Sequence, residues 1–150
     1  MDTSGVHLWL IVWKTYMALR EHAERHIESL GLGLSDFGVL ESLLHKGPLP
    51  VNTIGGMLQL TSGSITAAID RLESKGFVQR NCGVEDRRTR MVHLTDAGRR
   101  LIEGAFRTHE EAMERATSVL DPQERARLIE LLKKLGLGAQ QISANTTLVQ

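Results

Sequence analysis

Apolar residues recur every three or four positions over most of the chain, which is the spacing of one face of an α-helix. The first such stretch runs from about Leu8 to Leu30, carries charged residues on its other face, and precedes Gly31 and Gly33. The helix that it predicts is longer than a small domain needs for its own core. We therefore expect part of its apolar stripe to pack against another chain.

Two shorter helices are predicted next. The first begins near Ser35, whose hydroxyl is expected to cap it, and ends before Gly47. Leu49-Pro50-Val51 leads into the second, which runs to about Leu58, with Pro50 tolerated near its first turn. Within it, Gly55 and Gly56 each cost about 1 kcal/mol of helix propensity relative to Ala. We expect both glycines to allow close approach of a neighbouring helix.

The following helix has an unusual exposed face. Thr61 or Ser62 is expected to cap it and Gly76 to end it. Its predicted buried stripe is Ile65, Ala68, Ile69 and Leu72. Its opposite face consists of Ser62, Gly63, Ser64, Thr66, Ala67, Asp70 and Arg71. Small residues let a helix enter a groove, and hydroxyls and Arg reach phosphates and base edges. The stretch therefore predicts a recognition helix for the major groove of DNA.

A basic β-hairpin is predicted directly after this helix. Phe77–Arg80 alternates like a strand, residues 81–86 have turn composition, and Arg90–Leu94 reads as the returning strand. Three arginines lie within four residues of this hairpin, at Arg87, Arg88 and Arg90. Arginine is favoured in a narrow minor groove, where the potential is most negative. We expect the hairpin to contact DNA; a solvated basic loop is the alternative.

Two more helices complete the predicted order. Thr95 is expected to cap a second long helix. Asp121 and Glu124 have the spacing of a capping box and predict the start of the last helix. We expect Gly136 and Gly138 to end that helix, and the tail after them to be loosely held.

Composition bounds the function without deciding it. The 150 residues carry 18 basic and 18 acidic side chains, so the formal net charge is zero. Residues 49–100 nevertheless hold eight Lys and Arg against five Asp and Glu, and these residues contain the predicted recognition helix and hairpin. Charge distribution matters more for nucleic-acid binding than the sum. A protein of zero net charge with one basic face is therefore compatible with DNA binding.

One cysteine, Cys82, excludes an internal disulfide and favours a reducing compartment. The apolar run His7–Trp13 is too short to span a bilayer, so we expect a cytoplasmic protein. Cys82 falls in the predicted hairpin, where an inert thiol is favoured over a secondary oxidant sensor.

His22 and His26 are spaced to share a helical face, but no pattern supplies the three or four ligands that zinc requires, and we assign no metal ligands. The chain carries no nucleophile elbow, P-loop or dinucleotide fingerprint, so we assign no catalytic residue and no cofactor.

In this order, the elements resemble the MarR family of bacterial transcription regulators. The matching pieces are L-T-S-G-S-I-T-A-A-I-D-R-L-E-S-K-G-F-V and E-D-R-R-T-R-M-V-H-L-T-D-A-G, and the likeness covers about residues 8–135. It implies a mainly α fold with a small β-wing, in which a winged helix-turn-helix core is flanked by long dimerisation helices. Residues 1–33 and 117–150 would dimerise, residues 34–98 would form the DNA-binding domain, and residues 99–116 would be the connecting helix.

The resemblance also implies partners and site residues. Members are homodimers that bind palindromic double-stranded operators, with one recognition helix in each half-site. In the wing, Arg88 would enter the minor groove and Asp86 would orient it. The implied DNA-binding residues are Thr61, Ser62, Gly63, Ser64, Thr66, Ala67, Arg71, Asp86, Arg87, Arg88 and Arg90.

The family commonly binds small phenolic or aromatic acids, which loosen DNA binding. His7, Trp9, Trp13 and Tyr16, near the start of the first helix, are candidates for such an effector pocket, with core or interface packing as the alternative. We therefore expect a repressor released by a small effector. An oxidant- or metal-responsive regulator of the same fold, or a winged-helix module that binds protein, remains open.

Overall fold

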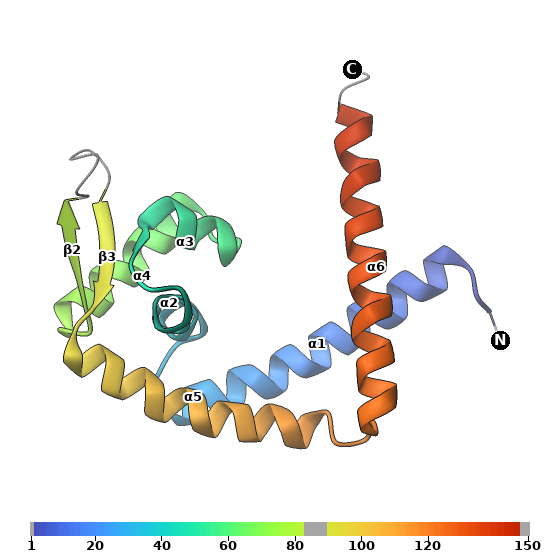
Figure 1. Ribbon diagram of the computed structural model, residues 1–150, viewed down its shortest axis with the longest axis horizontal. Helices are drawn as coiled ribbons and strands as arrows, with labels where there is room; N and C mark the ends of the chain where they lie inside the picture. Colours follow the sequence, from blue (N-terminus) through green and yellow to red (C-terminus); the bar gives the residue numbers. More distant parts are fainter. Residues whose placement is uncertain (1, 83–89, 148–150) are drawn as a thin grey trace. The chain divides into compact units, whose positions relative to one another are not determined.

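The protein is mainly α-helical with one small sheet, as predicted. The computed structural model describes residues 2–82 and 90–147 (Figure 1). The chain divides into two compact units, Met1–Met113 and Glu114–Gln150. In chain order the elements are α1 (Gly5–Ser29), α2 (Leu34–Lys46), β1 (Leu49–Pro50), α3 (Val51–Met57), α4 (Ser62–Ser74), β2 (Val78–Cys82), β3 (Arg90–Leu94), α5 (Asp96–Ala116) and α6 (Pro122–Thr147). Within the described ranges no helix is long and apolar enough to cross a membrane.

The sheet is antiparallel and has the strand order β1-β3-β2. The hairpin pairs Val78 with Leu94 and Cys82 with Arg90, so β2 continues two residues beyond the predicted strand into the expected turn. Leu49 and Pro50 were expected to lead into a helix, but they form the short edge strand β1 against Val92 and Met91 of β3. Pro50 is tolerated there because an edge strand does not need every backbone N–H for pairing.

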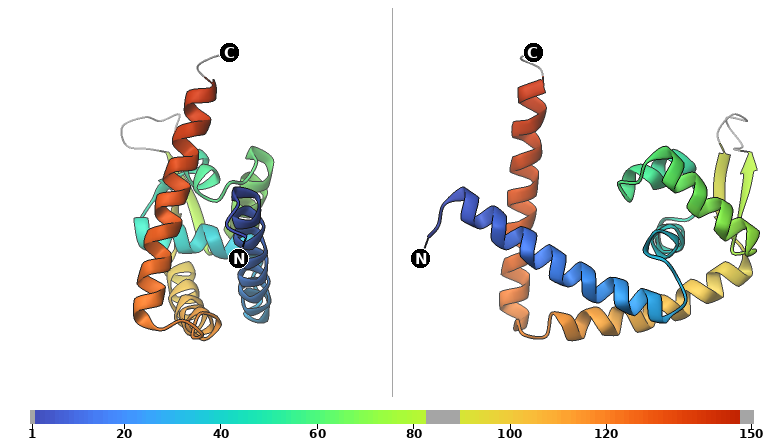
Figure 2. Two further views of the ribbon diagram at one scale, coloured as in Figure 1. Left: turned by 90° about the vertical axis from the view of Figure 1, so that its right-hand side faces the viewer. Right: turned by 180° about the vertical axis from the view of Figure 1, so that it is seen from behind.

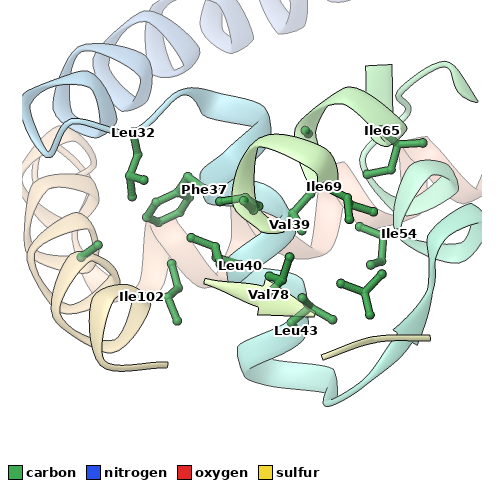
Figure 3. Close-up of a cluster of buried hydrophobic side chains, with 14 of the residues drawn as sticks. Leu32, Phe37, Val39, Leu40, Leu43, Ile54, Ile65, Ile69, Val78 and Ile102 are labelled. Carbon is green, nitrogen blue, oxygen red and sulfur yellow. The ribbon is translucent and has the colours of Figure 1, made fainter. Parts of the chain in front are cut away.

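The core of the first unit lies where α2, α3, α4 and the sheet meet, with α1 and α5 closing it (Figure 3). Leu40 of α2, Ile69 of α4 and Val92 of β3 are fully buried. Fully burying one such side chain contributes roughly 1.5–3 kcal/mol. The predicted stripe of α4 is confirmed, since Ile65, Ala68, Ile69 and Leu72 are all buried. This packing fixes which face of α4 points outward.

Capping side chains begin three helices where the sequence predicted them. The Thr61 hydroxyl accepts a hydrogen bond from the Ser64 backbone N–H. The Thr95 hydroxyl accepts from the Gly98 N–H at 3.0 Å. In the second unit, Asp121 accepts from the N–H groups of residues 123 and 124, while Glu124 accepts from the Asp121 N–H at 3.0 Å, a complete capping box.

Two predicted helix ends are wrong. Gly33, not Ser35, is the N-cap of α2, and a glycine has no side chain with which to cap the helix. The Ser35 hydroxyl instead accepts a hydrogen bond from Arg71. At the other end of the chain, α6 continues through Gly136 and Gly138 to Thr147, so residues 139–147 are helical. A glycine costs a helix only about 1 kcal/mol, and the leucines, alanine and glutamines around these two favour helix.

Candidate nucleic-acid interface

The outward face of α4 is the centre of the site. The hairpin of β2 and β3 lies beside α4 (Figure 1 and the right-hand view of Figure 2). Thr61 caps the helix with extended backbone, φ −65° and ψ 158°, and its hydroxyl lies 2.8 Å from that of Ser64. Exposed along this face are Thr61, Ser62, Gly63, Ser64, Thr66, Ala67, Asp70 and Arg71. The structure therefore brings the predicted α4 residues together on one accessible surface.

The turn before α4 holds it close to α3. Gln59, in that turn, has a positive φ of 53°, which the sequence did not predict for a non-glycine residue. A Cβ atom added at Gly55 of α3 would lie 3.2 Å from Cγ2 of Ile65 in α4, which confirms the expected close approach. The same expectation is wrong for Gly56, which is exposed and has no atom within 4 Å of an added Cβ.

Arg71 lies on the outward face but its guanidinium is bonded to α2. Its Nη2 donates to Asp36 Oδ1 at 2.6 Å and to the Ser35 hydroxyl at 3.3 Å. Asp36 is buried, with only 6% of its side chain exposed, whereas the Arg71 side chain is half exposed. The hydrogen bond to Asp36 raises the pKa of Arg71 further, so the guanidinium stays charged. Sequence reasoning missed this ion pair, since the residues lie 35 apart.

A second arginine, Arg80, joins β2 to α4. Its guanidinium donates to Asp70 Oδ1 and Glu73 Oε2, each at 2.5 Å, and its backbone N–H donates to Glu73 Oε1 at 2.9 Å. The Arg80 side chain is only 14% exposed. The bond from the Arg80 backbone N–H is the largest cause that lowers the pKa of Glu73. Arg80 therefore fixes the hairpin to α4.

The described part of the hairpin contributes one predicted residue. Arg90, the first residue of β3, is exposed. It borders an open cleft of about 560 Å³ whose other walls are β1, α3 and the start of α4, including Ser62. The predicted contacts Asp86, Arg87 and Arg88 lie outside the described residues.

The candidate effector residues lie on α1 and are all exposed. Trp9, Trp13 and Tyr16 follow each other at four and three residues and share one side of the helix. His7 stands two residues before Trp9, about 200° around the helix, so it does not join this aromatic row. Its ring lies 4.0 Å from the Asp2 carboxylate instead.

Histidines from α1 and α5 meet beside α2. The rings of His26 and His109 stack at 5.5 Å, and Phe37 packs on His109 at 4.9 Å. A ring nitrogen of His22 lies 3.1 Å from the Ala112 carbonyl oxygen. Burial lowers the pKa of His109, with smaller contributions from His26 and His22. Among the described residues, no group of three or more His, Cys, Asp or Glu side chains could hold a metal ion.

Known proteins are similar to this chain in sequence and in fold. The family model described as "MarR family" matches residues 32–89. The HTH-type transcriptional regulator MhqR of Bacillus subtilis is 35% identical over 141 residues, which cover 94% of this chain and 97% of that protein. A crystal structure of a mutant MarR from E. coli complexed with operator DNA matches with a TM-score of 0.77 at 25% identity, covering 87% of this chain and 94% of that one. AbsC of Streptomyces coelicolor, at 18% identity and a TM-score of 0.81, covers 94% of this chain and 97% of its own, and supports the fold alone.

These likenesses and the arrangement of α3, α4 and the β2–β3 hairpin define a winged helix-turn-helix DNA-binding protein. The chain belongs to the MarR family. It is a DNA-binding transcriptional regulator, and the relatives that it matches are regulators rather than enzymes.

Proposed function

We propose that the protein is a homodimeric repressor that binds a palindromic operator through α4 and the wing and is released by a small aromatic or phenolic effector. The observation that carries the proposal is the uncharged outward face of the N-terminal half of α4, from Thr61 to Ala67, beside a hairpin that has Arg90 exposed at the start of β3. A related E. coli regulator was crystallised with operator DNA. Arg87, Arg88 and Arg90 would supply the wing contacts to the phosphates and the minor groove, and Asp86 would orient Arg88.

The first half of α1 supports a second copy as partner. Leu8, Trp9, Leu10 and Ile11 are consecutive and all large and exposed, and Trp9 is 64% exposed. Because each helical residue points about 100° from the last, four in a row cover every side of the helix. A helix that is apolar all round is normally buried. These side chains are exposed, so we assign this half of α1 to the dimer interface.

A second uncovered row lies on α6. Leu128, Leu131, Leu132 and Leu135 have the spacing of one helical stripe, and they are 40–47% exposed in the single chain. Leu137 and Ile142 extend the apolar surface toward the C-terminus, at 62% and 70% exposed. Both rows fall within the residues 1–33 and 117–150 that the family resemblance assigns to dimerisation.

Two observations favour repression and release by an aromatic effector. MdtR of Bacillus subtilis, 29% identical over 114 residues, is named a transcriptional repressor. The row of Trp9, Trp13 and Tyr16 on α1 offers flat apolar faces, which suit a planar ring as well as a partner helix. Control by an oxidant or a metal is the second candidate, and Cys82 is the thiol that an oxidant would modify.

Selection of bound sequences from random DNA tests the proposal. We expect a two-fold symmetric site with half-sites about one DNA turn apart, and affinity that falls steeply with salt.

Light scattering tests the dimer and should give twice the mass of 16.7 kDa. Replacing Leu131 and Leu135 by Glu should give monomers, whereas the control Glu130→Gln on the same helix should not. Aromatic acids, quinones, peroxides and zinc are then added to the complex. No enrichment over random DNA would refute the DNA role, and release by peroxide or zinc alone would replace the aromatic effector.

A further inference from the structure

We propose that α4 reads its operator mainly through thymine methyl groups, contacted by Thr66 and Ala67, because Asp36 holds Arg71 away from the bases. The inference rests on the proposed sequence-specific DNA binding and names the determinants of specificity within it. Three observations support it: the residue types of α4, the bonds that Arg71 makes, and the side chains that remain exposed.

The sequence of α4 lacks most side chains that read bases with two hydrogen bonds. Arg or Lys pairs with guanine in this way, and Asn or Gln with adenine. Ser62–Ser74 contains no Lys, Asn or Gln, and its one Arg is Arg71. If Arg71 is engaged elsewhere, α4 has no side chain for a two-bond contact to a purine.

Arg71 is engaged with α2. It makes bonds of 2.6 and 3.5 Å to the two carboxylate oxygens of Asp36 and a third to the Ser35 hydroxyl. Turning the guanidinium toward DNA would leave the Asp36 carboxylate buried and unpaired, which is strongly unfavourable. Asp70, the residue of this face that could accept from cytosine, is likewise bonded to Arg80.

The side chains left at the N-terminal half of α4 are small, and they carry the methyl groups of Thr66 and Ala67 beside the hydroxyls of Ser62 and Thr66. This half is the part of a recognition helix that usually meets base edges. The hydroxyls of Thr61 and Ser64 are bonded to each other in the cap. Thr66 and Ala67 are exposed and present one methyl group each, and Gly63, one turn earlier, has open space around it. The thymine C5 methyl is the apolar group that the major groove offers to such side chains.

Replacing thymine by deoxyuridine tests the proposal with the unaltered protein. The selected operator is resynthesised with each thymine exchanged in turn, which removes the methyl group and keeps the pairing. We expect about a fourfold weaker affinity at one or more positions in each half-site, the effect of removing one buried methyl group. If no exchange changes the affinity of a site that is still bound specifically, the inference is wrong and the proposed function stands. Absence of specific binding refutes both.

Variants assign the recognition of the methyl group to particular side chains. Thr66→Ser keeps the hydroxyl and removes the methyl, so it should abolish the uracil penalty at one position, whereas the same change at exposed Thr108 on α5 should not. Asp36→Asn should free Arg71, and selection with this variant should yield a guanine preference that the unaltered protein lacks. Circular dichroism checks its fold, and the uracil exchange remains decisive if it unfolds. A guanine preference that the unaltered protein shows and that Arg71→Gln abolishes, with the fold intact, would also overturn the proposal.

Discussion

Gly98 of α5 lies directly against the backbone carbonyl of Phe77. A Cβ atom added at Gly98 would lie 1.9 Å from the Phe77 carbonyl oxygen and 2.8 Å from its carbon. The same oxygen accepts a hydrogen bond from the Thr95 N–H at 3.0 Å, and the Thr95 hydroxyl donates to the Gly76 carbonyl at 2.7 Å. The first turn of α5 is thereby fixed to the turn between α4 and β2, which sets where the wing leaves the recognition helix.

Gly98→Ala should therefore destabilise the DNA-binding domain. The obstruction is backbone, which cannot move as a side chain can, so we expect a loss of about 1–3 kcal/mol or more in the free energy of unfolding. Gly104→Ala on the same helix is the control, because an added Cβ there meets nothing within 4 Å. It should stabilise the protein by about 0.5–1 kcal/mol. Urea unfolding at fixed protein concentration measures both, and equal effects would contradict the close approach of Gly98 to Phe77.

Gly55 and Gly56 give a second matched pair, on α3. Alanine at Gly55 would place its Cβ 3.2 Å from Ile65 Cγ2, so that α3 and α4 must separate by a few tenths of an ångström. We expect reduced stability and weaker operator binding. Alanine at exposed Gly56 should add about 0.5–1 kcal/mol of stability and leave the spacing of the helices unchanged. Urea unfolding and gel shifts separate the two outcomes, and a stabilised Gly55→Ala protein would refute the tight packing.

Local sequence signals predicted the helix-turn-helix well. The caps at Thr61, Thr95 and Asp121 depend on side chains within three residues of the backbone groups that they bond, so they can be read from the sequence. The buried stripe of α4 follows from helical period alone. The strand β1 could not be predicted in this way, since two residues carry no period and the pairing partner of Leu49 is Val92.

The site was predicted less completely than the fold. Exposure of the α4 residues was foreseen, but the bonds that decide what Arg71 and Arg80 can reach join distant parts of the chain. Asp36 and Arg71 are brought together only when α2 packs on α4, and charge spacing along the sequence gives no hint of it. The sequence carried a weak indication of the Arg80 ion pairs. Asp70 and Glu73 are three residues apart and so share a face of α4, and only a short turn separates this helix from Arg80.

Arg80 should act on stability and wing position rather than as a DNA contact. Arg80→Ala removes two bonds from a largely buried guanidinium to the more exposed carboxylates of Asp70 and Glu73. Bonds to charged groups contribute about 1.5–3 kcal/mol, and solvent screening of exposed partners places the effect near the lower end. We expect that order of destabilisation, measured by urea unfolding. The salt dependence of operator binding should keep its slope, since the guanidinium does not neutralise a phosphate. Gln79→Ala, an exposed change on the same strand, is the control, and a slope reduced by about 1 would show that Arg80 contacts DNA.

Arg88→Ala tests the wing contact that the family resemblance implies. If Arg88 enters the minor groove, its removal should weaken operator binding and lower the magnitude of the salt slope by about 1. Light scattering should still give the dimer. The matched change Arg115→Ala, at the last turn of α5, should leave the salt slope unchanged. Operator affinity that is unaffected by Arg88→Ala would refute the assignment.

His109 should make the fold sensitive to acid. Burial lowers its pKa in the folded state, so the unfolded chain binds a proton more readily, and stability falls as pH decreases below the ordinary histidine value of about 6.5. Its neighbours His22 and His26 on α1 oppose the same protonation. His109→Leu keeps an apolar group against Phe37 and removes the titration. Urea unfolding between pH 7.5 and 5.5, at one protein concentration, measures the effect. The His109→Leu protein should lose less stability over this range than the unaltered protein or the control His7→Gln, which changes an exposed histidine. An unchanged pH dependence would exclude His109 as its source.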